Sequence, residues 1–262
     1  MKISVLKNRE PFDKILISTL NLFFNSLYNE KYKIKLSSKF SLTKNNDMNQ
    51  VWYCNTLINS IFMYNVNYDV FSSINGEYSF NPNKPFKSFF QKVYLKLSQT
   101  KYFNILLSHY TYIINPAIEN GRNKLIIGGN KKIRIIDIEK KEVFVVLKKD
   151  FDKIYIQREI FIRKNFSFIS TPKIIQNHNN NFWYSEEYVS GIPPNRLKKS
   201  KFKIILDKII SELIMLREKT KKTTYIEEYL SSLNSKFNND LEKTLLFSDS
   251  KKNEIVPAVP VW

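Results

Sequence analysis

The sequence predicts an α+β fold, and three observations support this prediction. Apolar residues recur at helical spacing through most of the first 115 residues. The pattern then changes to short runs rich in β-branched residues, LIIGG, KIRIIDI and EVFVVLKK, which polar turns separate. Two more short runs and a long helical pattern follow. We therefore expect a helical region over residues 1–115, an antiparallel sheet with one helix over residues 122–191, and further helices over residues 192–262.

The first region is predicted to contain three helices joined by loops. Its clearest pattern covers residues 11–29, with the apolar stripe Phe12, Ile15, Leu16, Thr19, Leu20, Phe23, Phe24 and Leu27. Weaker stripes of the same spacing over residues 51–62 and 86–97 predict the second and third helices. Residues 72–87 contain one glycine and two prolines, which indicates a loop. No catalytic motif is found in this region, and we expect its aromatic residues to form a core.

A break at Asn115-Pro116 extends to Arg122, and we expect a domain boundary there that proteases cut between residues 115 and 123. The order expected after the break is β-β-β-α-β-β-α-α. The strands lie within residues 125–129, 132–138, 142–149, 172–175 and 182–189, and the helices cover residues 152–164, 200–219 and 225–246. The run NHNNN at residues 177–181 is expected to form a hairpin turn.

Composition limits the classes of protein to which the chain belongs. Hydrophobic residues make up 43% of the chain and aromatic residues 15%, which is enough to build a core. No apolar run approaches the roughly 20 residues that span a bilayer. The first residues lack the apolar stretch of a secretory signal, so we expect a cytoplasmic protein. The single cysteine, Cys54, excludes an internal disulfide, and His109 and His178 are too few for a zinc site without a carboxylate.

The net charge of +18 makes nucleic acid an obvious candidate partner. However, only seven of the 42 basic residues are arginine, and the lysines are scattered along the chain. Proteins that read nucleic-acid sequence usually depend on arginine, because its guanidinium bonds bases and phosphates in pairs. We therefore expect no dedicated nucleic-acid binding, although the charge favours phosphorylated ligands in general.

A glycine turn stands between the first two strands expected after the break. In Gly128-Gly129-Asn130, the missing Cβ atoms would let backbone N–H groups approach phosphate oxygens. Taken alone, the same residues more simply form a plain hairpin turn. The segment is not a Walker A motif, because no Gly-Lys-Ser or Gly-Lys-Thr follows it.

The third expected strand ends in Val145-Val146-Leu147-Lys148, and side chains alternate along a strand, so Val146 and Lys148 share a face. If the register slips by one residue, Lys149 takes the place of Lys148. Glu159 follows on the next expected helix, eleven residues after Lys148. It can pair with that lysine, or it can be a surface charge beside Arg158.

These features, together with the segment WYSEEYVSG at residues 183–191, resemble the small lobe of protein-kinase-like enzymes. The resemblance is to the aminoglycoside phosphotransferase and choline kinase family, and it covers residues 122–262. It implies an ATP- and magnesium-dependent phosphotransferase whose acceptor is a hydroxyl of a sugar, aminoglycoside, amino alcohol or glycan precursor. A nucleotide and this small molecule are the implied partners.

The resemblance also implies roles for individual residues. Gly128, Gly129 and Asn130 would approach the phosphates, Val146 would lie against the adenine, and Lys148 would reach the α and β phosphates while paired with Glu159. Backbone groups of Glu187 and Val189 would bond the adenine edge. Glu186 stands where the family often has an apolar residue. The alignment of residues 183–191 with the family's hinge can therefore be shifted by one residue.

The family's catalytic loop, His-Gly-Asp-x-x-x-x-Asn, occurs nowhere in the 262 residues. We expect the segment IVPAVPVW at residues 255–262 to lead into that loop, and this chain by itself to be an inactive fragment without a catalytic residue or a metal ligand. A non-catalytic pseudokinase that acts as a binding or scaffolding module is the first alternative, and a basic protein associated with nucleic acid is the second, less favoured one.

The first testable prediction concerns the coding sequence. We expect the DNA that follows the codon of Trp262 to encode His-Gly-Asp, or a close variant, within roughly ten codons, the length of a short connection in a compact domain. Sequencing downstream of this codon is the measurement, and an unrelated gene at that place would favour the pseudokinase.

Overall fold

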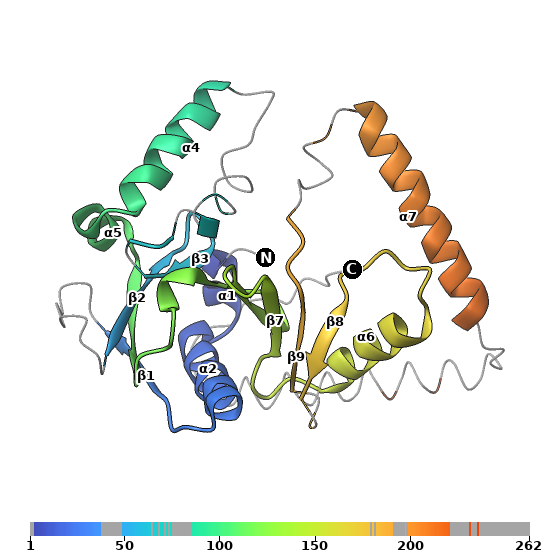
Figure 1. The fold of residues 1–262 in the computed structure, drawn as a ribbon, viewed down its shortest axis with the longest axis horizontal. Helices are drawn as coiled ribbons and strands as arrows, with labels where there is room; N and C mark the ends of the chain where they lie inside the picture. The colour runs from blue at the N-terminus through green and yellow to red at the C-terminus, as the bar shows by residue number, and fades with distance from the viewer. Residues whose placement is uncertain are drawn as a thin grey trace. The chain divides into compact units, whose positions relative to one another are not determined.

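The computed structural model describes residues 3–37, 49–63, 65–67, 69–70, 72, 74, 85–178, 180, 182–190, 197, 199–220, 231 and 235. Its helices are α1 (Ile3–Arg9), α2 (Phe12–Tyr28), α4 (Pro85–Ser98), α5 (Lys101–Leu107), the 3-10 turn η1 (Gly121–Asn123), α6 (Ile154–Asn165) and α7 (Lys199–Thr220). Its strands are β1 (Lys33–Ser37), β2 (Gln50–Asn55), β3 (Ser60–Phe62), β4 (Tyr110–Asn115), β5 (Lys124–Ile127), β6 (Lys132–Asp137), β7 (Glu142–Leu147), β8 (Ile174–Asn177) and β9 (Trp183–Glu187). The predicted α+β class is confirmed (Figure 1).

The strands form one nine-stranded sheet in the order β1-β4-β2-β3-β5-β6-β7-β9-β8, and neighbouring strands run antiparallel. Strand β3 pairs with β5 through Ser60 opposite Ile127 and Ile61 opposite Ile126. Residues 1–115 and 122–191 therefore contribute to the same sheet. The order predicted after the break is observed as β5-β6-β7-α6-β8-β9-α7.

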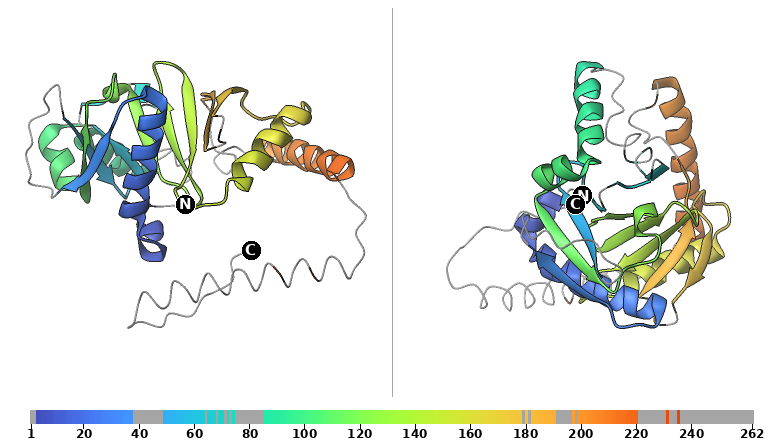
Figure 2. Two further views of the ribbon diagram at one scale, coloured as in Figure 1. Left: turned by 90° about the horizontal axis from the view of Figure 1, so that it is seen from below. Right: turned by 60° about the vertical axis from the view of Figure 1, so that its left-hand side comes forward.

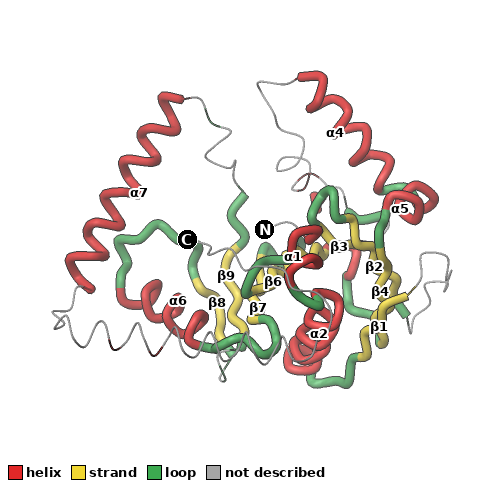
Figure 3. The backbone as a smooth tube through the Cα atoms, turned by 180° about the vertical axis from the view of Figure 1, so that it is seen from behind, coloured by secondary structure: helices red, strands yellow, loops and turns green. Residues whose placement is uncertain are grey.

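The helix predicted over residues 51–62 is wrong, because these residues form β2 and β3 (Figure 3). All residues of β2 from Val51 onward are buried on both sides of the sheet, so the strand lacks the alternation that identifies a half-exposed strand. Asn55 then turns the chain, since its side-chain oxygen accepts bonds from the backbone N–H groups of Leu57 (3.1 Å) and Ile58 (3.4 Å). Asn59 completes the turn with a positive φ of 57°.

The mostly helical character predicted for residues 1–115 needs correction for the same reason, since this region also supplies β1 and β4. The helices α2 and α4 agree with the stripes predicted near residues 11–29 and 86–97.

The segment before β5, where a domain boundary was expected, is packed into the structure. Ile118 and Gly121 are buried, and the side-chain amide of Gln50 donates a 2.6 Å hydrogen bond to the carbonyl of Ile118. This packing opposes the proteolysis predicted between residues 115 and 123.

Helices cover both faces of the sheet at β6, β7 and β9. The α2 face is defined by side chains that share one core with Leu16, Leu20 and Phe23 of α2, namely Ile133, Ile135, Phe144, Val146 and Trp183. The α6 face is defined by side chains that pack with Ile156 and Ile160 of α6, namely Val143, Val145, Leu147 and Tyr184. Because side chains alternate along each strand, a residue on one of these faces is separated from the other by the sheet itself.

Helix α2 is anchored by aromatic and polar contacts. The ring of Phe23 lies 5.4 Å from that of Phe144 and 5.6 Å from that of Trp183, both nearly edge-to-face. Trp183 also donates a 3.1 Å hydrogen bond to the hydroxyl of Ser26. Near the start of the helix, the hydroxyl of Tyr112 in β4 donates a 2.6 Å bond to Asp13. The preceding helix α1 is joined to α2 by a short turn at Glu10 (Figure 2).

The last described helix, α7, agrees with the prediction for residues 200–219. Contacts divide the chain into two units, Met1–Glu212 and Leu213–Trp262, and α7 supplies residues to both. In the first unit, Glu212 accepts bonds from the backbone N–H (3.0 Å) and hydroxyl (2.7 Å) of Ser170.

The predicted helix over residues 225–246 and the segment at residues 255–262 lie outside the described residues, apart from positions 231 and 235. The described helices include none that is both long and apolar enough to cross a bilayer.

The second testable prediction concerns the α2 face. Phe23→Ala removes a fully buried ring from the contact of α2 with β7 and β9, so we expect the free energy of unfolding to fall by about 3–5 kcal/mol. The neighbouring Leu22 is 46% exposed, and Leu22→Ala should change stability by less than about 0.5 kcal/mol. Urea unfolding of both variants measures the difference, and equal losses would contradict the packing described here.

Candidate functional site

In the glycine turn between β5 and β6, the backbone at Lys132 occupies the space beside Gly129. A Cβ atom added to Gly129 would lie 2.4 Å from the carbonyl oxygen of Lys132, a separation that real Cβ atoms do not adopt. Neither Gly128 nor Gly129 has a positive φ, so glycine is required at position 129 by this close approach. A Cβ atom at Gly128 would come within 3.1 Å of Ile3 and 3.2 Å of Phe12. The turn therefore packs against the N-terminal helices on one side.

Val146 and Lys148, predicted to face the nucleotide, lie under these helices. Val146 is fully buried in the core that α2 forms with the sheet. The side chain of Lys148 is also fully buried and forms an ion pair with Glu10, in the turn between α1 and α2. The ammonium group lies 5.5 Å from the ring centre of Phe12 and 5.7 Å from that of Phe151. Burial lowers the pKa of Lys148 below its ordinary value, although the bond and charge of Glu10 partly oppose this shift.

The predicted ion pair between Lys148 and Glu159 is therefore wrong in this structure. Lys148 continues the alternation of Phe144 and Val146 and lies on the α2 face, whereas Glu159 projects from α6 over the α6 face. The two side chains are separated by the sheet. Sequence spacing correctly placed Lys148 at the end of a strand and Glu159, eleven residues later, on the next helix, but it did not determine which face of the strand the helix covers.

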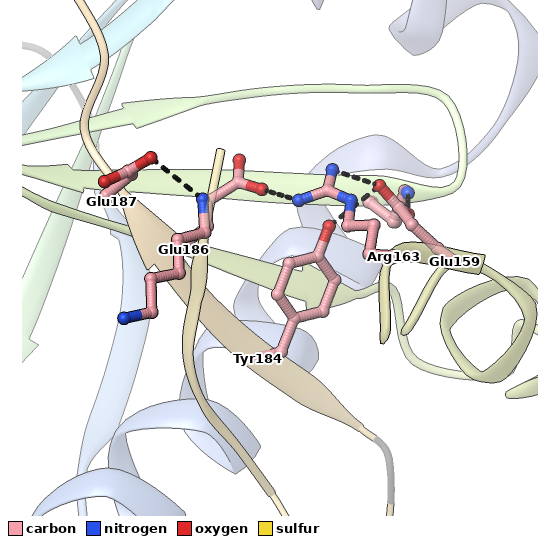
Figure 4. Close-up of polar contacts among 7 residues, drawn as sticks. Glu159, Arg163, Tyr184, Glu186 and Glu187 are labelled. Atoms are coloured by element: carbon pink, nitrogen blue, oxygen red, sulfur yellow. Dashed lines mark hydrogen bonds and ion pairs between the residues drawn. The ribbon is translucent and has the colours of Figure 1, made fainter. Parts of the chain in front are cut away.

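Glu159 is instead the centre of a polar cluster on the α6 face (Figure 4). It forms an ion pair with Lys132 of β6, accepts a 2.7 Å bond from Arg163 one helical turn later, and accepts a 2.8 Å bond from the hydroxyl of Tyr184. Arg163 lies between two carboxylates and also pairs with Glu186 of β9. The cluster thus connects β6, α6 and β9 through charged hydrogen bonds, which are stronger than neutral ones.

The pKa of Glu159 reflects this environment. Burial raises the pKa of the carboxyl, but the bond and charge of Lys132, the hydroxyl of Tyr184 and the charge of Arg163 lower it by more, so the pKa lies below its ordinary value. Glu159 is therefore a fixed anion near neutral pH. It can hold a cationic side chain in place beside the glycine turn, because Lys132 is the residue whose carbonyl closes that turn.

The predicted hinge residues lie where β9 ends. The backbone N–H of Glu187 donates a 3.0 Å bond to the carbonyl of Lys173, so this group is engaged within the structure. The carboxylate of Glu187 accepts a 3.0 Å bond from the backbone N–H of Lys173, and Figure 4 draws no contact between it and Arg163. Val189 is exposed beyond the strand, and Gly191 of the same motif lies outside the described residues. The polar residue at position 186 is explained by its pair with Arg163.

Sequence reasoning missed the two residues that the fold pairs with Lys148 and Glu159. Glu10 is the partner of Lys148, and Lys132 is the partner of Glu159. Glu10 lies 138 positions before Lys148, and no local spacing relates the two. For Lys132, the sequence does contain a pattern from which its position could have been predicted. It directly follows the glycine turn, and it alternates with the apolar Ile133, so a helix on the polar side of β6 would meet it.

Cation sites can be assessed for the described part of the chain. Among those residues, no group of three or more histidine, cysteine, aspartate or glutamate side chains could hold a metal ion.

Comparison of the chain with protein-family models, with curated proteins and with solved structures finds no match.

The third testable prediction concerns the pH dependence of stability. Because folding lowers the pKa of Glu159, its ionised form stabilises the fold above the ordinary pKa of a glutamate, about 4.3, and this contribution is lost as the pH falls through and below that value. Glu159→Gln should cost about 1–3 kcal/mol at neutral pH. It should also flatten the decline of stability between about pH 5 and pH 3.

The matched control is Glu30→Gln, since Glu30 is exposed beyond the end of α2. Chemical unfolding across this pH range should give the control the slope of the unmodified chain. A slope for Glu159→Gln equal to that of the control would show that the cluster does not hold Glu159 ionised.

Proposed function

We propose that the chain carries the nucleotide-binding part of an ATP-dependent small-molecule phosphotransferase of kinase-like fold, related to the aminoglycoside phosphotransferases and choline kinases. One observation supports this most. A tight glycine turn between two antiparallel strands lies next to an ion pair between a lysine of the sheet, Lys132, and a carboxylate of the following helix, Glu159. Enzymes of this class bind phosphates with such a turn and with a lysine that pairs with a helix carboxylate, but their lysine stands on the third strand, whereas Lys132 stands on the second of the three strands here.

The order of elements around the ion pair adds support. Three antiparallel strands, β5 to β7, are followed by α6 and then by the paired strands β8 and β9. This agrees with the antiparallel sheet and single helix that the sequence resemblance implied. The acceptor proposed is a hydroxyl of a sugar, aminoglycoside, amino alcohol or glycan precursor, and a cytoplasmic location, where ATP is abundant, belongs to the same proposal.

A second candidate function is a non-catalytic binding or scaffolding module of the same fold. A specific observation favours it, namely that α2 covers Val146 and that Glu10 engages Lys148. The face that the family resemblance assigned to the nucleotide is thus filled by the protein itself. ATP binding on the α6 face would favour the phosphotransferase, whereas a failure to bind nucleotide would leave the scaffolding module.

The fourth testable prediction is weak binding of ATP without turnover. We expect calorimetric titration of the 262-residue chain with ATP and magnesium to give a dissociation constant of about 0.1–1 mM, a binding free energy of about 4–5.5 kcal/mol. A phosphate-transfer assay over sugars and aminoglycosides should detect no product, because the sequence contains no His-Gly-Asp motif.

The variant that tests the turn is Gly129→Ala, whose added methyl group would meet the carbonyl oxygen of Lys132. We expect it to weaken ATP binding about tenfold, or about 1.4 kcal/mol. Gly121→Ala is the matched control, because its methyl group would meet the movable side chains of Gln50 and Met63 beyond the other end of β5. An absence of ATP binding by the unmodified chain would refute the proposed function.

A further inference from the structure

Lys148 is poorly placed to contact a ligand beside α6. Its side chain is 0% exposed, and its ammonium group is engaged by Glu10 beneath the N-terminal helices. Glu159 lies across the sheet from it, on the α6 face. To reach a phosphate held near Glu159, Lys148 would have to leave its partner and cross the plane of a hydrogen-bonded sheet. An unpaired charge would then remain at the partly buried Glu10, which is costly.

Lys132, in contrast, is well placed to contact a ligand beside α6. It is the first residue of β6, immediately after the glycine turn, and its side chain lies on the α6 face, paired with Glu159. The side chain is 25% exposed, so its ammonium group can exchange a contact with Glu159 for one with a ligand. Glu159 would keep Arg163 and Tyr184 as partners during that exchange. The carboxylate therefore stays in position when Lys132 turns toward an anion.

The surface next to Lys132 suits a nucleotide. Arg134 is exposed two residues further along β6, on the same face by alternation, and it pairs in register with Ile127 of β5. Ile127 and Ile136 are only partly exposed on this face, because they pack against the core that contains Phe62, Leu95 and Leu125. Lys132 and Arg134, two cations on the same face of β6, attract a polyphosphate.

We propose that Lys132, rather than Lys148, is the lysine that contacts the phosphates of a nucleoside triphosphate, and that Glu159 is the counter-ion that holds it beside the glycine turn. This inference rests on the proposed function. It assigns the α6 face of β6, beside the glycine turn, as the ligand-binding surface. The pair between Lys148 and Glu10 is then a structural contact that fastens the N-terminal helices to β7.

Calorimetric titration of the full chain with ATP, and separately with inorganic tripolyphosphate, tests the assignment. Lys132→Gln should lower the affinity for both ligands at least tenfold and make the remaining affinity less sensitive to salt, since one phosphate contact is lost. Lys132→Arg keeps a cation opposite Glu159 and should restore binding to within threefold. Lys140→Gln is the matched control, because it removes an equal charge from an exposed position at the other end of β6.

The double variant Glu10→Gln/Lys148→Met removes both charges of the buried pair, which avoids leaving one of them alone. We expect it to bind ATP within threefold of the unmodified chain, and an unfolding curve for each variant verifies that it is folded. Loss of affinity in the double variant, or unchanged affinity in Lys132→Gln, would overturn the assignment of Lys132 while ATP binding itself survives. Absence of ATP binding by the unmodified chain would instead overturn the proposed function, and binding of tripolyphosphate alone would reject a nucleotide as the ligand.

Discussion

The packing of α2 against one face of the sheet is the interaction on which the rest of this structure depends. Phe23 contacts Phe144 and Trp183, and the same core includes Trp52 and Tyr112 from strands that precede the glycine turn. Burial of this much apolar and aromatic surface is the main favourable contribution to folding. Because one helix covers strands from both parts of the chain, the strands before and after the expected boundary form a single sheet.

The position of α2 also determines which side of the sheet can hold a ligand. The α2 face is filled with apolar side chains, and Glu10 and Phe12 surround the ammonium group of Lys148. The α6 face instead carries a charged cluster in which Lys132, Glu159 and Arg163 are only partly buried. A buried charge needs a partner, and a partly exposed charge can exchange its partner for a ligand. This difference in burial is the reason for assigning the candidate site to Lys132 and Glu159.

Several elements could be predicted from the sequence because their patterns were long or strongly periodic. The stripe of α2, the glycine turn, strands β5 to β7 and helix α6 are examples, and each of these is observed near its predicted position. The strands β2 and β3 were mistaken for a helix, because a strand buried on both faces has no alternation of apolar and polar residues. Short apolar runs of this kind fit either structure, and only pairing with β4 and β5 decides between them.

The sequence by itself determined the α+β class, the local elements of residues 124–220 and the residue types that could bind phosphate, because these depend on interactions between near neighbours along the chain. The tertiary structure decided which charges meet. Glu10 reaches Lys148 across 138 positions, and Glu159 meets Lys132 across 27. Which face of a sheet a helix covers depends on the packing of the whole core, and a strand presents opposite faces at successive residues. The face of the sheet that a helix covers therefore decides whether Lys132 or Lys148 meets Glu159, and no local pattern in the sequence distinguishes these two lysines.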